Sequence, residues 1–213
     1  MKIAPLLLPL LLFPLIACQQ AYYQTMEQFG YHKREIMVDR VGAARDSQTE
    51  AKEQFKDALE KFNALVDYDG GNLEKLYDKL SGELDQSKAK ATAVRERIDG
   101  VEDVSEALFD EWEAELEQYS SASLRASSER RLKETKSQYR DLVRAMRRAE
   151  AKMKPVLAAL NDQVLFLKHN LNARAVASLE GELAGVESDV AALIRDMEAS
   201  IAEADAFIET LSN

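Results

Sequence analysis

Cysteine is almost absent from this sequence of 213 residues, which contains only Cys18. A single cysteine has no partner within the chain, so the fold cannot depend on an internal disulfide. Histidine is nearly as scarce, with His32 and His169 as the only two. No metal-ligand spacing, glycine-rich phosphate loop or nucleophile motif accompanies them. We therefore expect no catalytic residues, no metal site and no cofactor, and hence a protein that is not an enzyme.

Proline is scarce as well, and Pro155 is the only one after the first 17 residues. The rest of the chain is rich in Ala, Glu, Lys, Leu and Arg, a composition typical of long helices and coiled coils. Basic residues are also outnumbered, because 28 Lys and Arg are present against 38 Asp and Glu, which gives a net charge of −10. An acidic chain argues against general binding of nucleic acid.

The N-terminus has the pattern of an exported lipoprotein. Lys2 precedes an uncharged stretch from Ile3 to Ile16, which is too short for a transmembrane helix and has the length of the apolar part of a signal peptide. The sequence Leu15-Ile16-Ala17-Cys18 then resembles the lipobox of bacterial lipoproteins. That resemblance implies cleavage before Cys18 and attachment of lipid to its thiol. The alternatives are an ordinary cleaved signal peptide with a chance cysteine, or a short N-terminal membrane helix.

The residue after Cys18 bears on the membrane that holds the protein. In Gram-negative lipoproteins an Asp at this position usually retains the protein in the inner membrane, so Gln19 favours the outer membrane with the chain facing the periplasm. We therefore expect residues 1–17 to be a lipoprotein signal peptide. Residues 18–213 are then expected to form a single elongated helical domain.

Apolar residues recur in alternating steps of three and four, the repeat of a coiled coil. These stripes predict an all-α fold, with helices over about residues 22–67, 73–118, 123–169 and 174–211. The alternative for the last two is one continuous helix over about 123–211. Similar lengths and short connections predict an elongated antiparallel four-helix bundle made of coiled-coil hairpins. Pro155 lies inside the third helix, where we expect a kink.

The stripes predict which residues are buried. The first stripe is Met37, Val41, Ala44, Gln48, Ala51, Phe55, Ala58, Phe62 and Leu65. The second stripe reaches Trp112, Glu115 and Tyr119. The fourth stripe is Val176, Leu179, Leu183, Val186, Val190, Leu193, Met197, Ile201, Ala204, Ile208 and Leu211.

Charge is distributed unevenly along the predicted helices. Residues 99–117 carry nine acids and no base, residues 125–154 carry eleven bases against four acids, and residues 180–209 carry nine acids and one base. Antiparallel folding places the basic half between the two acidic halves, which favours that arrangement over a parallel one. The alternative to this pairing is that the basic face from Arg125 to Lys154 is unpaired and binds phosphate-rich partners such as lipid headgroups.

Three stretches resemble an uncharacterised family of bacterial lipoproteins known as domain of unknown function 2959. They are residues 22–35 (YYQTMEQFGYHKRE), residues 107–113 (ALFDEWE) and residues 164–173 (VLFLKHNLNA). The resemblance extends over the chain after the signal peptide. It implies no known activity and no catalytic residues.

The end of the bundle farthest from Cys18 is the candidate partner-binding site. The run from Val164 to Leu167 at this end is more apolar than a two-position stripe requires, and exposed apolar surface at the end of an element suggests a partner site. The alternative is that these four residues fill a wider core. The candidate residues are Gly70, Gly71, Leu165, Phe166, His169, Asn170 and Asn172.

The expected function is a non-enzymatic envelope scaffold, or interaction rod, in the periplasm. Its expected partners are the membrane, through lipidated Cys18, and a further envelope protein. No nucleic acid is expected as a partner, and the sequence identifies no small-molecule substrate. The alternative function is a membrane-shaping or lipid-binding helical module that uses the basic face from Arg125 to Lys154.

Overall fold

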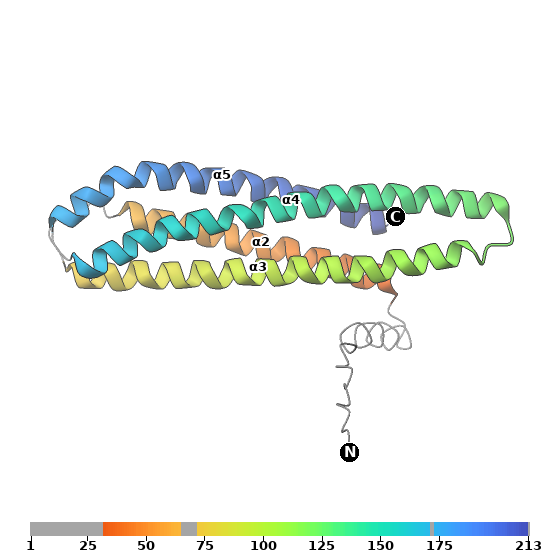
Figure 1. Ribbon diagram of the computed structural model, residues 1–213, viewed down its shortest axis with the longest axis horizontal. Coiled ribbons are helices and arrows are strands. Elements are labelled where there is room, and N and C mark those ends of the chain that lie inside the picture. Colours follow the sequence, from red (N-terminus) through yellow and green to blue (C-terminus); the bar gives the residue numbers. More distant parts are fainter. Residues whose placement is uncertain (1–31, 65–71, 171–172, 213) are drawn as a thin grey trace, which may run out of the picture.

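The computed structural model describes residues 32–64, 72–170 and 173–212. Its four helices are α2 (Lys33–Asn63), α3 (Leu73–Leu116), α4 (Ala122–His169) and α5 (Ala173–Ser212). They run side by side along one long axis (Figure 1). Helices α2 and α4 each contact both α3 and α5, so consecutive helices are antiparallel neighbours and α5 packs back on α2. The predicted all-α bundle is thus confirmed.

The helix ends follow the polar signals in the sequence. The Asn72 side chain accepts hydrogen bonds from the backbone N–H groups of Glu74 (2.9 Å) and Lys75 (3.2 Å) and so caps the start of α3. The Asn170 side chain donates to the Phe166 carbonyl oxygen (2.9 Å) at the end of α4. Since α4 ends at His169, the alternative of one continuous helix over about 123–211 is wrong.

Two helix interiors contain residues that weaken helices, and both helices continue through them. Pro155 lies within α4, and Gly100 lies within α3. The predicted first helix is shorter than expected at its C-terminal end, because α2 ends at Asn63 and not near residue 67. Its predicted start at residue 22, like the signal peptide and Cys18, lies outside the described residues.

One continuous core runs along the bundle, and all four helices contribute to it. The stripe predicted for α2 is confirmed, because each of its described members is buried: Met37, Val41, Ala44, Gln48, Ala51, Phe55, Ala58 and Phe62. Apolar burial along this core is the main contribution to stability, at about 25 cal/mol per Å².

The stripe predicted for the second half of α5 is wrong at two positions. Ser200 and Phe207 are buried, whereas Ile201 and Ile208 are only half-buried. The Ser200 hydroxyl donates to the Gln48 side-chain oxygen (2.8 Å) inside the core. The Phe207 ring centroid lies 6.4 Å from that of Tyr139. Contacts with α2 and α4 therefore decide which side of α5 faces inward.

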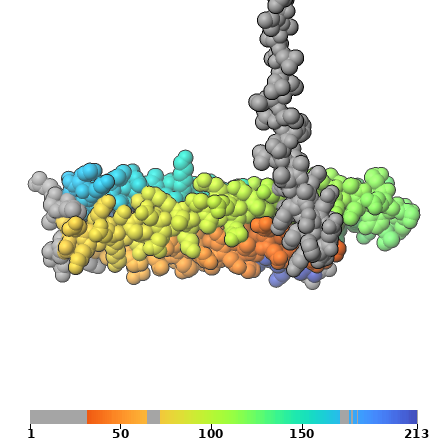
Figure 2. Space-filling view, turned by 90° about the horizontal axis from the view of Figure 1, so that it is seen from below, coloured from red at the N-terminus to blue at the C-terminus, as the bar shows by residue number. Residues whose placement is uncertain are grey.

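The α3–α4 hairpin extends beyond the other two helices at one end of the bundle (Figures 1 and 2). Lys33 at the start of α2 contacts Glu111 (3.0 Å), and Arg131 donates to the Thr210 carbonyl near the end of α5 (3.4 Å). We call residues 112–131, which lie at and past these contacts, the hairpin end. There the Trp112 indole N–H donates to the Ser128 hydroxyl (2.8 Å) and links the two helices.

The predicted second stripe fails at the hairpin end. Glu115 and Tyr119 are exposed and Trp112 is half-buried, although the heptad pattern placed all three in the core. Trp112 and Glu115 line a shallow pocket with Lys33 at the start of α2 and Leu211 near the end of α5, so they lie at the level where these two helices end. Tyr119 lies beyond the end of α3.

Candidate functional site

The candidate partner-binding residues that the structure describes lie at the end of the bundle opposite the hairpin end. We call this the distal end, where α2 and α4 end and α3 and α5 begin (Figure 1). Leu165, Phe166, His169 and Asn170 lie together in and just after the last turns of α4. The other three candidates, Gly70, Gly71 and Asn172, lie outside the described residues.

The apolar run at residues 164–167 divides into two buried and two exposed side chains. Val164 is 6% exposed and Leu167 is fully buried, so the core explanation holds for these two. Leu165 and Phe166 are 48% and 40% exposed, and the core explanation fails for them. These two are therefore large apolar side chains presented at the distal end.

The two histidines lie at opposite ends of the bundle. His32 immediately precedes α2, and His169 is the last residue of α4. They cannot contribute to one site, because the length of the bundle separates them (Figure 1). No three His, Cys, Asp or Glu side chains lie close enough to hold a metal ion in the part of the chain that the structure describes.

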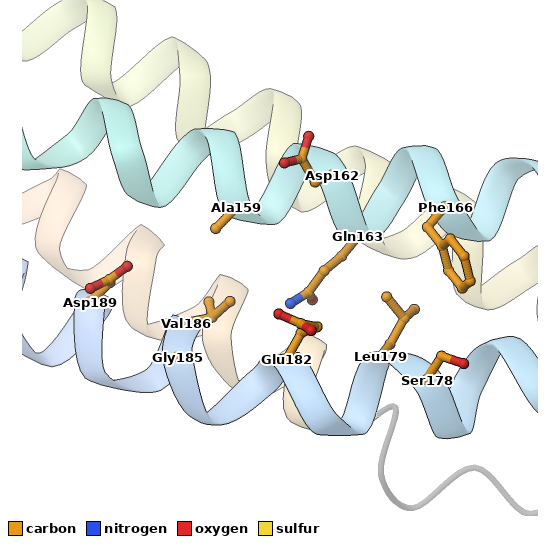
Figure 3. Close-up of a pocket in the computed structure, with 10 residues that line it drawn as sticks. All are labelled: Ala159, Asp162, Gln163, Phe166, Ser178, Leu179, Glu182, Gly185, Val186 and Asp189. Carbon is orange, nitrogen blue, oxygen red and sulfur yellow. The ribbon is translucent and has the colours of Figure 1, made fainter.

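A groove between α4 and α5 opens beside Phe166 at the distal end (Figure 3). Its volume is about 540 Å³. The residues that line it are Ala159, Asp162, Gln163 and Phe166 from α4, and Ser178, Leu179, Glu182, Gly185, Val186 and Asp189 from α5. Except for Phe166, none of them belongs to the predicted site.

The groove lies where the bundle loses one of its helices. The Asn63 side chain at the end of α2 donates to Glu187 (2.8 Å), so α2 ends level with that residue of α5. Ser178 to Val186 lie beyond that level. Among the described helices, α2 therefore accompanies only part of the groove.

Gln163 is the unusual residue of the groove. It is only 4% exposed, yet neither its side-chain oxygen nor its nitrogen has a hydrogen-bond partner among the described residues. Burying an amide without a partner costs about 1–3 kcal/mol, and most buried polar groups avoid this cost. The amide points from α4 across the groove toward Glu182 on α5 (Figure 3).

Among the side chains that the structure describes, all charged ones that line the groove are acidic. They are Asp162, Glu182 and Asp189, and none forms an ion pair within the described residues. Apolar walls come from Phe166, Leu179 and Val186. The groove thus combines negative charge and apolar surface with one buried amide.

The basic part of α4 is divided between paired and unpaired cations. Six of its eleven bases form ion pairs: Arg125, Lys136, Arg144, Arg147, Arg148 and Lys152. The other five form no ion pair within the described residues: Arg130, Arg131, Lys133, Arg140 and Lys154. Pairs with α3 and α5 agree with the predicted placement of basic between acidic segments.

Arg147 is the centre of the densest ion-pair network. It contacts Glu102 (3.1 Å) and Asp99 (2.5 Å) on α3, and Glu150 (2.9 Å) on its own helix. Hydrogen bonding to Glu102 is the main cause that raises the pKa of the Arg147 guanidinium. The network therefore ties α4 to α3 near the middle of the bundle.

We predict that Arg147→Gln lowers the free energy of unfolding by about 1 kcal/mol, because several charge-assisted hydrogen bonds are lost from a side chain that is only 32% exposed. Urea denaturation followed by circular dichroism measures the change, which should shrink as salt screens the ion pairs. The matched control is Arg144→Gln, since Arg144 is 69% exposed and pairs only with Asp141 on its own helix. Equal losses in the two variants would contradict the assignment.

Comparison with known proteins adds a family but no activity. The family model described as "Protein of unknown function (DUF2959)" matches residues 22–211. No curated protein matches the chain. The match covers all four helices except the last residue of α5. Over the described residues, no helix has an apolar stretch long enough to cross a membrane.

Proposed function

This chain belongs to the DUF2959 family of proteins of unknown function, and from that premise we propose that it is a non-enzymatic, lipid-anchored scaffold of a Gram-negative cell envelope. In this proposal, the signal peptide over residues 1–17 directs export and Cys18 carries the lipid. The protein is then held at the outer membrane and extends into the periplasm.

The observation that carries the proposal is the position of the two ends. The described part of the chain begins next to Lys33, which contacts Glu111, whereas Leu165 and Phe166 lie at the distal end. Helix α5 between these levels has 40 residues, which corresponds to about 60 Å at 1.5 Å per residue. A continuous core along the bundle makes this a rod that holds its distal end away from the anchored end.

We further propose that the rod presents its distal end to an envelope protein. Leu165 and Phe166 are two of the four large apolar side chains that are exposed among the described residues. Adjacent exposed apolar side chains are typical of sites that a partner covers. Their exposure supports this proposal.

We predict that Leu165→Asp abolishes a crosslink from a photoreactive residue placed at Lys168, while the melting temperature changes by less than about 2 °C. The aspartate removes apolar contact with the partner but remains in water, so it adds no buried charge. In-cell crosslinking followed by mass spectrometry identifies the partner, and thermal denaturation of the purified chain measures stability.

The control for this experiment is Leu124→Asp at the hairpin end, where the side chain is 59% exposed. This variant should keep the crosslink, because Leu124 lies at the opposite end of the rod from Lys168. A crosslink that persists in the Leu165→Asp variant, or marked destabilisation by that change, would argue against a partner site at Leu165.

The alternative function is a lipid-binding or membrane-shaping module that uses the basic face from Arg125 to Lys154. Five cations on that face that form no ion pair within the described residues favour it: Arg130, Arg131, Lys133, Arg140 and Lys154. The other six are engaged by carboxylates, which leaves less charge available for headgroups. We therefore place this function second.

A further inference from the structure

The groove between α4 and α5 has the size and composition of a small-molecule site. A volume of about 540 Å³ lies within the range of roughly 300–1,000 Å³ that is common for ligand pockets. Such pockets combine apolar walls with a few polar groups that orient the ligand. Here Phe166, Leu179 and Val186 supply the walls, and the Gln163 amide is the buried polar group.

Gln163 indicates that the groove is incomplete without a ligand. Its amide is buried, has no partner among the described residues and points into the groove (Figure 3). A ligand that donates an N–H to the amide oxygen would remove part of the cost of burying it.

The charge of the groove identifies the ligand as a cation. Asp162, Glu182 and Asp189 line it, no Lys or Arg does, and these carboxylates form no ion pair within the described residues. A ligand must also cover the apolar walls, which suits methylene groups rather than a hydrated ion. The chemistry therefore points to ammonium groups joined by an alkyl chain.

The spacing along α5 gives the length of that chain. Glu182 and Asp189 are seven residues apart on one face of the helix, which separates them by about 10 Å along its axis. Gly185 lies between them, and a Cβ atom added there would meet no atom within 4 Å. Because Gly185 has no side chain, the surface between the two carboxylates is open. A linear molecule can lie across it.

We propose that this groove binds a linear polyamine. Its terminal ammonium groups pair with Glu182 and Asp189, its methylene groups pass over Gly185 against the apolar walls, and one N–H reaches the Gln163 oxygen. Asp162 lines the groove from α4 with its carboxylate directed away from α5, so it contributes only longer-range attraction (Figure 3). The proposal does not depend on lipid attachment or on the scaffold role.

Isothermal titration of spermidine into the full-length chain in detergent, at about 150 mM salt to screen weak attraction, tests the proposal. We expect saturable binding of one spermidine per chain. The double variant Glu182→Gln/Asp189→Asn should bind at least tenfold more weakly. Gly185→Leu should abolish binding, because leucine fills the floor of the groove while the helix gains a better helix former.

Two controls separate the groove from general attraction to an acidic protein. Glu96→Gln/Asp103→Asn removes the same charges at the same spacing from exposed positions on α3. Gly82→Leu makes the matched substitution at another helical glycine with no atom within 4 Å of an added Cβ. Both control variants should bind spermidine as the unmodified chain does.

Three results would overturn the proposal. The first is no saturable binding of spermidine to the unmodified chain. The second is equal weakening in the groove variants and their controls, which would show only attraction of cations to an acidic protein. The third is binding of a lysine-rich peptide without binding of spermidine, which would assign the groove to a basic protein partner.

Discussion

Replacement of Phe55 by alanine is expected to lower the free energy of unfolding by about 3–5 kcal/mol. Phe55 lies in the middle of the core stripe of α2 and is fully buried. Its neighbours on that stripe, Ala51 and Ala58, are also fully buried and are too small to fill the space that the ring leaves. The variant therefore loses both the transfer free energy of the ring and the contacts around the resulting cavity.

Chemical denaturation followed by circular dichroism measures this loss. Phe166→Ala is the matched control, because Phe166 is 40% exposed and its removal should cost less than about 1 kcal/mol. Similar losses for the two variants would contradict the orientation of α2 or α4 in the bundle.

Cys18→Ala is expected to release the protein almost completely from the membrane fraction. Each methylene group buried in the bilayer contributes about 0.8 kcal/mol, so loss of two or more acyl chains removes far more binding energy than any exposed side chain can replace. The expectation rests on the lipobox resemblance at residues 15–18. No described helix offers another way to span the membrane.

Metabolic labelling with a fatty-acid analogue, together with membrane fractionation, measures the outcome. The control is Gln19→Asp, which keeps the cysteine and should keep the label while it moves the protein to the inner membrane. Label that remains on the Cys18→Ala variant would end the lipoprotein hypothesis.

Most of the fold could be predicted because the buried face of a long helix appears in the sequence as regularly spaced apolar residues. The steps of three and four along α2 found all of its buried positions except Ile36, and Asn72 marked the start of α3 by its capping chemistry. The prediction failed in α5, where the chain offers both Ser200 and Ile201 for one inward position. A buried hydrogen bond to Gln48, 152 residues away, favours Ser200, and periodicity within one helix contains no such information.

The candidate site was less predictable for a similar reason. Two apolar residues beside each other, Leu165 and Phe166, are visible in the sequence, but the groove beside them needs two helices and the end of a third. Gln163 looks like a surface residue between Asp162 and Val164. The available signal was the repeat itself, because a step of three from Leu160 reaches residue 163 and a step of four from there reaches Leu167.

The unequal lengths of the helices also have a mechanical consequence. The chain joins the bundle at Lys33, so the hairpin end projects past the attachment point by about ten residues of α4, or roughly 15 Å. On the other side about 60 Å of α5 lead to the distal end. A rigid rod that pivots near Lys33 has a short arm, the hairpin end, and a long arm that leads to the distal end. In the proposed lipid-anchored protein, a displacement of the hairpin end by a bilayer or a neighbouring protein moves the distal end about four times as far in the opposite direction.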